Sequence, residues 1–174
     1  MEYLVYSIGG SETNNAKWTA TTKNMKLSQI APNAIYSDKI TSPQDVVLAI
    51  RYSETERKPY SKTTYVTIPA QRKAPDTVVE SNTSSTYMLS FGDASEDRVY
   101  QYSIVKPNTT WNESKASFRT VKKATTIVLK SSKYPEGTKI YVRLKGVDET
   151  SKYSPVLPSV SKEYKVTYTT NTTN

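Results

Sequence analysis

Two short apolar stretches, VVLAIR at residues 46–51 and IYVRL at residues 140–144, decide the fold of this chain. Each contains an arginine at or near its end, Arg51 in the first and Arg143 in the second. A brief apolar run rich in β-branched residues is typical of a buried strand rather than of a helix. The two stretches therefore predict a pair of equivalent buried strands.

The landmarks around these stretches recur in the same order. They are YSI (residues 6–8 and 102–104), a tryptophan (Trp18 and Trp111) and a Tyr-Ser pair (beginning at Tyr60 and Tyr153). The offset between matching landmarks stays between 92 residues, for the arginines, and 96 residues, for YSI. Such small drift indicates a tandem repeat, and a duplicated module without reactive residues is usually a structural or binding unit.

The composition favours strands and excludes several kinds of chemistry. Tyrosine is frequent, at 14 of 174 residues, and tyrosine suits half-buried β surfaces. The chain has no cysteine and no histidine. The first absence excludes disulfides and thiolate nucleophiles, and the second removes the commonest general base near neutral pH. We therefore expect no enzymatic activity, no cofactor and no bound metal.

Stretches of strand length recur along the whole chain. They cover residues 3–8, 45–51, 65–68, 86–91, 99–104, 125–129, 139–145 and 164–168, with glycine, proline and asparagine turn signals between them. No stretch has an apolar period of 3.6 residues over the length of a helix. The sequence thus predicts an all-β chain built from two tandem antiparallel β-sandwich domains.

The expected boundary lies in the proline-flanked segment PAQRKAP at residues 69–75. Repeat 1 then spans residues 1–72, and repeat 2 spans residues 73–174 with a polar C-terminal tail. Repeat 2 has a strand, TYMLSF, ahead of its YSI strand, and repeat 1 has no equivalent. We expect repeat 1 to lack its first strand. We expect an upstream segment to cover the open edge, with a strand from another chain or this chain's own tail at residues 164–170 as the alternatives.

The quoted residues resemble the repeat modules of Gram-positive surface proteins, such as S-layer and cell-wall-associated proteins. The resemblance rests on MEY at the start of the chain, VTIPA at residues 66–70 and YPEGTKIYVRLKGVDET at residues 134–150. It implies immunoglobulin-like or fibronectin-III-like folds that act as spacers, lattice units or adhesive units. It also implies an extracellular location, at the bacterial surface or cell wall.

Six residues at equivalent places in the repeats are candidates for ligand contact: Trp18, Trp111, Tyr60, Tyr153, Arg51 and Arg143. An exposed tryptophan could stack on a sugar ring, and an arginine could bind an external carboxylate. The alternative is structural: each tryptophan packs over its sheet, and each tyrosine caps the core. Each arginine then lays its stem on the sheet and pairs its guanidinium with a carboxylate or stacks it on the tryptophan of its unit.

The carboxylates form no recognisable site. GDASEDR at residues 92–98 is the best calcium candidate, but its spacing matches no known calcium loop. A glycosidase needs two carboxylates that face each other across a cleft, and the sequence indicates no such pair. No metal-binding or catalytic residue is therefore predicted.

Two functions from different classes fit these observations. The first is a non-catalytic structural, spacer or lattice-forming module of a secreted, S-layer-like surface protein, with neighbouring domains of that protein or further copies of itself as partners. The alternative is a module that binds a glycan or an anionic cell-wall polymer through surface aromatics and the net charge of +8. Nucleic acid is not expected, because the charges form no dense run with interleaved aromatics. Membrane insertion is not expected either, because no apolar stretch is long enough.

Overall fold

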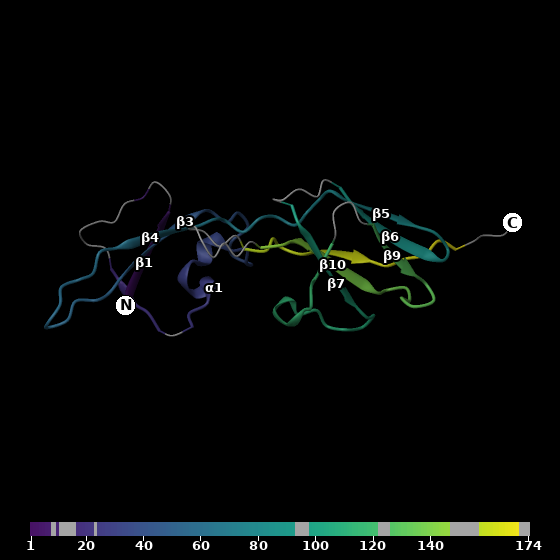
Figure 1. Cartoon of the computed structure of the whole chain (residues 1–174). Coiled ribbons are helices and arrows are strands. Elements are labelled where there is room, and N and C mark those ends of the chain that lie inside the picture. The colour runs from purple at the N-terminus through teal and green to yellow at the C-terminus, as the bar shows by residue number, and fades with distance from the viewer. Residues whose placement is uncertain are drawn as a thin grey trace. The chain divides into compact units, whose positions relative to one another are not determined.

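The computed structural model describes residues 1–7, 10, 17–22, 24–92, 98–121, 126–146 and 157–170 (Figure 1). Every strand pair among these residues is antiparallel, which confirms the predicted all-β class. The chain divides into two compact units. Unit 1 comprises Met1–Gln71 with Gly146–Leu157, and unit 2 comprises Arg72–Lys145 with Pro158–Asn174.

Unit 2 is a two-layer sandwich. Its elements are β5 (Val78–Asn82), β6 (Thr86–Phe91), β7 (Tyr100–Val105), η2 (Glu113–Lys115), β8 (Arg119–Thr120), β9 (Thr126–Lys130), β10 (Lys139–Leu144) and β11 (Lys162–Lys165). One sheet has the order β5-β6-β9 and the other has the order β11-β10-β7-β8. Three strands facing four in this order is the arrangement of immunoglobulin-like and fibronectin-III-like sandwiches.

The core of unit 2 follows from strand alternation. Tyr87, Leu89 and Phe91 of β6 are buried, whereas the residues between them are half-buried. They meet Ile140 and Val142 of β10, which are fully buried. A buried tyrosine hydroxyl needs a partner, and that of Tyr87 donates a hydrogen bond to the Glu80 carboxylate. Side chains that alternate at period two therefore close the space between the two sheets.

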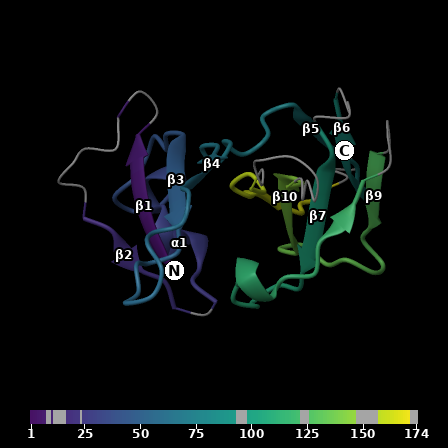
Figure 2. The same ribbon diagram turned by 60° about the vertical axis from the view of Figure 1, so that its left-hand side comes forward.

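Unit 1 has one four-stranded sheet among its described residues. Its elements are β1 (Glu2–Ser7), β2 (Thr19–Ala20), α1 (Leu27–Ile30), η1 (Pro32–Ala34), β3 (Val46–Arg51) and β4 (Thr64–Ile68). The sheet order is β2-β1-β3-β4, and Figure 2 shows β1 and β3 side by side. This order matches β8-β7-β10-β11 of unit 2, strand for strand.

Short helices, rather than a second sheet, pack on the inner face of the unit 1 sheet. Ala31 and Ala34 are fully buried and form a small core with Val46 of β3 and Ile68 of β4. Leu27 of α1 packs against the same cluster. Among the described residues of unit 1 there is no counterpart of β5, β6 or β9. The described residues of unit 1 thus form the four-stranded sheet and no second one, and the absence of a first strand from repeat 1 stays a prediction.

The predicted strands agree with the structure to within about two residues at most ends. The main omission was β5, whose sequence VVESN is apolar only at its start, so it shows little alternation. The edge strands β2 and β8 have two residues each and carry no periodic signal. The helices α1 and η1 are too short to give an amphipathic pattern.

We expect Leu89→Ala to destabilise unit 2 by about 3 kcal/mol, because Leu89 has no exposed surface and its loss leaves a cavity. Urea unfolding in a Trp18→Phe background measures this, because the fluorescence of Trp111 then reports on unit 2. Leu48→Ala in unit 1 should cost less, about 1 kcal/mol, because Leu48 is only partly buried. A loss below about 1 kcal/mol for Leu89→Ala would contradict the assignment of this core.

Candidate functional site

The arginine of β3 in unit 1 lies between two aromatic rings. The Arg51 Cζ atom is 3.9 Å from the ring centroids of both Trp18 and Tyr60. Its Nε atom donates a hydrogen bond of 3.1 Å to the Glu2 carboxylate on β1. Arg51 and Glu2 side chains are only 18% and 22% exposed, so the charge pair is partly shielded from water. The arrangement is the one expected for a structural arginine.

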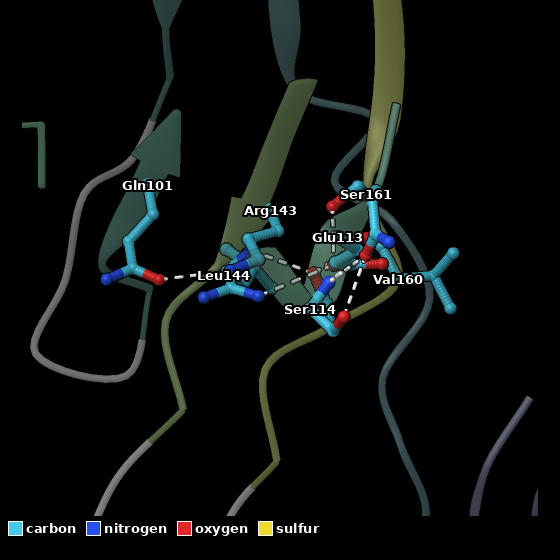
Figure 3. A network of polar contacts seen from close by, with 9 residues as sticks. Gln101, Glu113, Ser114, Arg143, Leu144, Val160 and Ser161 are labelled. Carbon is cyan, nitrogen blue, oxygen red and sulfur yellow. Dashed lines mark hydrogen bonds and ion pairs between the residues drawn. The ribbon is translucent and has the colours of Figure 1, made fainter. Parts of the chain in front are cut away.

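The arginine of β10 in unit 2 has matching contacts. The Arg143 Nε atom donates a 3.1 Å hydrogen bond to the side-chain oxygen of Gln101 on β7. Its Cζ atom is 3.5 Å from the ring centroid of Phe118. Figure 3 shows Arg143 between Gln101 and Glu113, whose carboxylate is 3.4 Å from the Arg143 Nη1 atom. The Ser161 hydroxyl donates a 2.8 Å hydrogen bond to the same carboxylate.

A serine closes the end of the arginine strand in both units. In unit 1 the Tyr52 N–H donates to the Ser61 hydroxyl oxygen at 2.7 Å, and the Ser61 N–H donates to the Tyr52 carbonyl at 3.3 Å. In unit 2 the same two bonds join Leu144 and Ser159, at 2.7 Å and 3.1 Å. Ser61 is therefore equivalent to Ser159.

These registers correct the sequence alignment of the repeats. Arg51 pairs across the sheet with Glu2, and Arg143 pairs with Gln101. The aromatic residue just before the edge strand is Trp18 in unit 1 and Phe118 in unit 2. Trp18 is therefore equivalent to Phe118, and the expected match of Trp18 with Trp111 is wrong. The aromatic position lies 16 residues after Glu2 in unit 1 and 17 residues after Gln101 in unit 2, whereas Trp111 follows Gln101 by only ten residues and falls within the loop.

Trp111 has a separate structural role. Its indole stacks on the ring of Tyr141 with centroids 3.7 Å apart and planes 5° apart. It also meets Phe118 edge-on at 5.8 Å. Tyr141 points away from the sandwich core, yet it is only 6% exposed because the indole covers it. Trp111 thereby anchors the loop at residues 106–118 on the outer face of the sheet.

The Tyr141 hydroxyl below this stack donates a hydrogen bond to the Glu163 carboxylate on β11. Burial and this bond raise the pKa of Tyr141 to about 12. The same hydrogen bond and the ammonium of Lys139, which is 3.2 Å from the carboxylate, lower the pKa of Glu163 below its usual value. The pair links the two neighbouring strands β10 and β11.

A groove lies beside this loop in unit 2, with a volume of about 900 Å³. Its lining includes four basic residues, Lys106, Lys115, Arg119 and Lys133, and none of the lining residues that the structure describes is acidic. Tyr102, Trp111 and Tyr134 contribute aromatic surface. Sequence reasoning identified only Trp111 among these residues. The cations lie far apart in the sequence and form no run, so only the fold brings them together.

The candidate ligand residues divide into three groups. Trp18, Arg51, Trp111 and Arg143 are all partly buried and engaged in contacts within their own unit. Tyr60 is 48% exposed, with its ring against Arg51. Tyr153 lies outside the described residues, as do residues 93–97 of the calcium candidate. Ligand contact by these residues stays a prediction.

Two further observations bear on the site. Among the residues that the structure describes, no three acidic, cysteine or histidine side chains come together in a way that could hold a metal ion. In the same part of the chain, no helix has the length and apolarity needed to cross a membrane.

No protein-family profile matches the sequence, and no curated protein is similar enough to count as a relative. Among solved structures, the chain is similar to one described as the crystal structure of chicken CNTN1 FN1-FN3 domains. The identity is 16% and the TM-score is 0.34, over 94% of this chain and 55% of that chain. The chain thus spans about half the length of that structure. The sandwich assignment for unit 2 rests on its own strand order.

Replacing Arg143 with leucine should lower the stability of unit 2 by about 1–2 kcal/mol, because the partly buried hydrogen bond and the ring contact are lost together. Arg143→Lys should also lower the stability of unit 2, because an ammonium lacks the planar fork of donors that a guanidinium has. Urea unfolding measures both variants. Lys130→Leu, at an exposed position on β9, is the matched control and should change the stability by less than about 0.5 kcal/mol. An equal loss in all three variants would contradict the role of Arg143.

The Tyr141–Glu163 pair should make the stability of unit 2 depend on pH in two windows. Glu163 has a lowered pKa when folded, so its contribution is present above the usual pKa and is lost as the pH falls through the folded value. Tyr141 has a raised pKa, so its contribution is present below pH 10 and is lost as the pH rises towards 12.

Thermal unfolding across pH checks both windows. Glu163→Gln should flatten the acid limb, and Tyr141→Phe should flatten the alkaline limb. Glu136→Gln is a suitable control for the acid limb, because Glu136 is exposed and lies outside this pair. An acid limb that Glu163→Gln leaves unchanged would show that the pair contributes nothing measurable.

Proposed function

We propose that the chain is a non-catalytic structural or spacer module of a bacterial cell-surface protein, related in role to S-layer and wall-associated repeats. The observation that carries the proposal is a cluster around one arginine, which we call the arginine cluster. It consists of Arg51, Glu2 and Trp18 in unit 1 and of Arg143, Gln101 and Phe118 in unit 2. It recurs in both units with the same strand register and the same kind of partners. Side chains that could contact a ligand are used in each unit to fasten one strand to the next.

Side-chain contacts that join the strands within each repeat are suited to a module that bears mechanical load or holds other domains at a fixed distance. Hydrogen bonds and ring contacts across strands stabilise each sheet without any group reserved for chemistry. Unit 2 adds a sandwich with a well-buried core. An extracellular position and neighbouring modules in a longer polypeptide belong to the same proposal.

The alternative, a module that binds a glycan or wall polymer, stays a prediction. Trp18 and Trp111 each contact residues of their own unit, so neither indole is simply an open platform. What supports the alternative is the positive charge of the chain. The structural function and the alternative differ in what the indoles do when a glycan is added.

Acrylamide quenching and a polymer pull-down separate the two functions. For a spacer, we expect weakly quenched indoles whose emission does not change when purified wall polymers are added. Any retention on the polymers at low salt should disappear at physiological salt, because it reflects only net charge. Retention that persists at physiological salt and protects an indole from quenching would overturn the spacer function and support glycan binding.

A further inference from the structure

The groove of unit 2 is bounded by an open strand edge. Strand β7 pairs with β10 on one side along its whole length, but on the other side it pairs with β8 only at Gln101 and Tyr102. Residues 103–105 continue β7 beyond that point and line the groove. An edge of this kind can accept a strand from another polypeptide.

Two backbone hydrogen bonds at the start of β7 show to which side each residue of the strand points its N–H and C=O groups. The Tyr100 carbonyl accepts from Val121 on the β8 side, and the Val99 carbonyl accepts from Lys145 on the β10 side. Because successive residues in a strand point their backbone groups to opposite edges, even-numbered residues of β7 face the β8 side. The N–H and C=O groups of Ile104 therefore face the groove.

Within the part of the chain that the structure describes, no backbone hydrogen bond outside the strand ladders involves Ile104. Ile104 is itself half-buried. A donor and an acceptor that face the same edge on one half-buried residue favour a partner that offers both groups at strand spacing, which is a polypeptide in an extended conformation.

The charges around the edge define the chemistry of that polypeptide. Lys106, Lys115, Arg119 and Lys133 all line the groove and are all exposed. Glu113 lies next to the groove wall, but its carboxylate is held by Arg143 and Ser161. The groove thus presents positive charge, with no acidic residue among its described lining, which complements an acidic ligand.

We infer that the groove of unit 2 binds an acidic segment of a partner protein, which adds as an extended strand to the β7 edge at Ile104. The partner backbone exchanges hydrogen bonds with Ile104, and its carboxylates lie near the lysines and Arg119. Tyr102, Trp111 and Tyr134 supply the apolar surface for the side chains between the acidic ones. This interaction goes beyond a spacer role, because it gives the module a partner.

The test uses the whole chain and a fluorescent peptide in which glutamate and valine alternate. Fluorescence anisotropy should show binding that weakens as salt rises, because exposed charge pairs are screened. A matched peptide carries N-methyl-valine at its centre, which removes one backbone donor and keeps the charge. It should bind about tenfold more weakly, the effect of roughly 1.4 kcal/mol.

Charge-reversal variants locate the binding surface. The double variant Lys106→Glu with Lys115→Glu should bind the parent peptide about tenfold more weakly or worse, because attraction becomes repulsion at both positions. Lys130→Glu makes a matched change at an exposed lysine outside the groove and should bind like the unaltered chain. Circular dichroism confirms that the variants are folded before binding is compared.

Amide hydrogen exchange gives a readout that does not depend on the variants. In the chain alone, the Ile104 amide should exchange faster than that of Ser103, whose backbone faces β10. The peptide should slow exchange at Ile104. Equal binding of both peptides would overturn strand addition, and polygalacturonate binding that displaces the peptide would assign the groove to an anionic glycan instead. Absence of peptide binding at low salt would also overturn the inference.

Discussion

The guanidinium groups of Arg51 and Arg143 join three strands at the outer face of each four-stranded sheet. Each arginine stands on the third strand in chain order of its sheet, bonds to a side chain on the first, and meets an aromatic ring that directly precedes the short edge strand. A charge that is less than one-fifth exposed is costly unless it is paired. The acceptor and the ring are therefore requirements of the arginine rather than additions to it.

The need of each arginine for a ring contact explains why two such short edge strands stay paired with the sheet. β2 and β8 have two residues each, and strands of this length have little stability of their own. Trp18 and Phe118 hold them in place by packing on an arginine that stands two strands away in the same sheet. The serine bonds at the far end of the arginine strand, to Ser61 and Ser159, hold the chain that returns towards the sheet.

In unit 2 the same constraint leads to the groove. The loop at residues 106–118 must bring Phe118 to Arg143, and on the way Trp111 covers Tyr141 and Glu113 reaches Arg143. The loop therefore leaves the line of β8 and cannot pair with the rest of β7. Ile104 keeps its outward backbone groups, and lysines from the loop gather beside them. The contacts that engage Trp111 and Arg143 on the face of the sheet thus leave the edge of β7 open at Ile104.

The two units share this outer face and differ in the inner one. In unit 2 a three-stranded sheet covers β7 and β10, and the core includes large side chains such as Tyr87 and Leu89. In unit 1 the corresponding face of β1 and β3 meets α1 and η1, and two of the four buried core residues are alanines. The smaller core is the physical reason for expecting unit 1 to depend more on its arginine cluster.

The sequence by itself determined the strand content, the central strands with their arginines, and a repeat without the residues that most enzymes and metal sites need. Period-two alternation and β-branched runs are local patterns, so they can be recognised in the sequence without a structure. They placed β3, β6, β10 and both arginines. The expected partner of each guanidinium is a carboxylate or the tryptophan of its unit. Arg51 contacts Glu2 and Trp18, whereas Arg143 contacts Glu113 and stacks on Phe118 rather than on a tryptophan.

Only the tertiary structure decided which residues of the two repeats are equivalent. Landmark spacing matched Trp18 with Trp111 and Tyr60 with Tyr153, whereas strand register matches Trp18 with Phe118. Spacing fails there because insertions in loops change distances along the chain without changing pairing across the sheet. The groove was also invisible in the sequence, because its four cations come from separate segments and its open edge exists only once β7 has paired with β10.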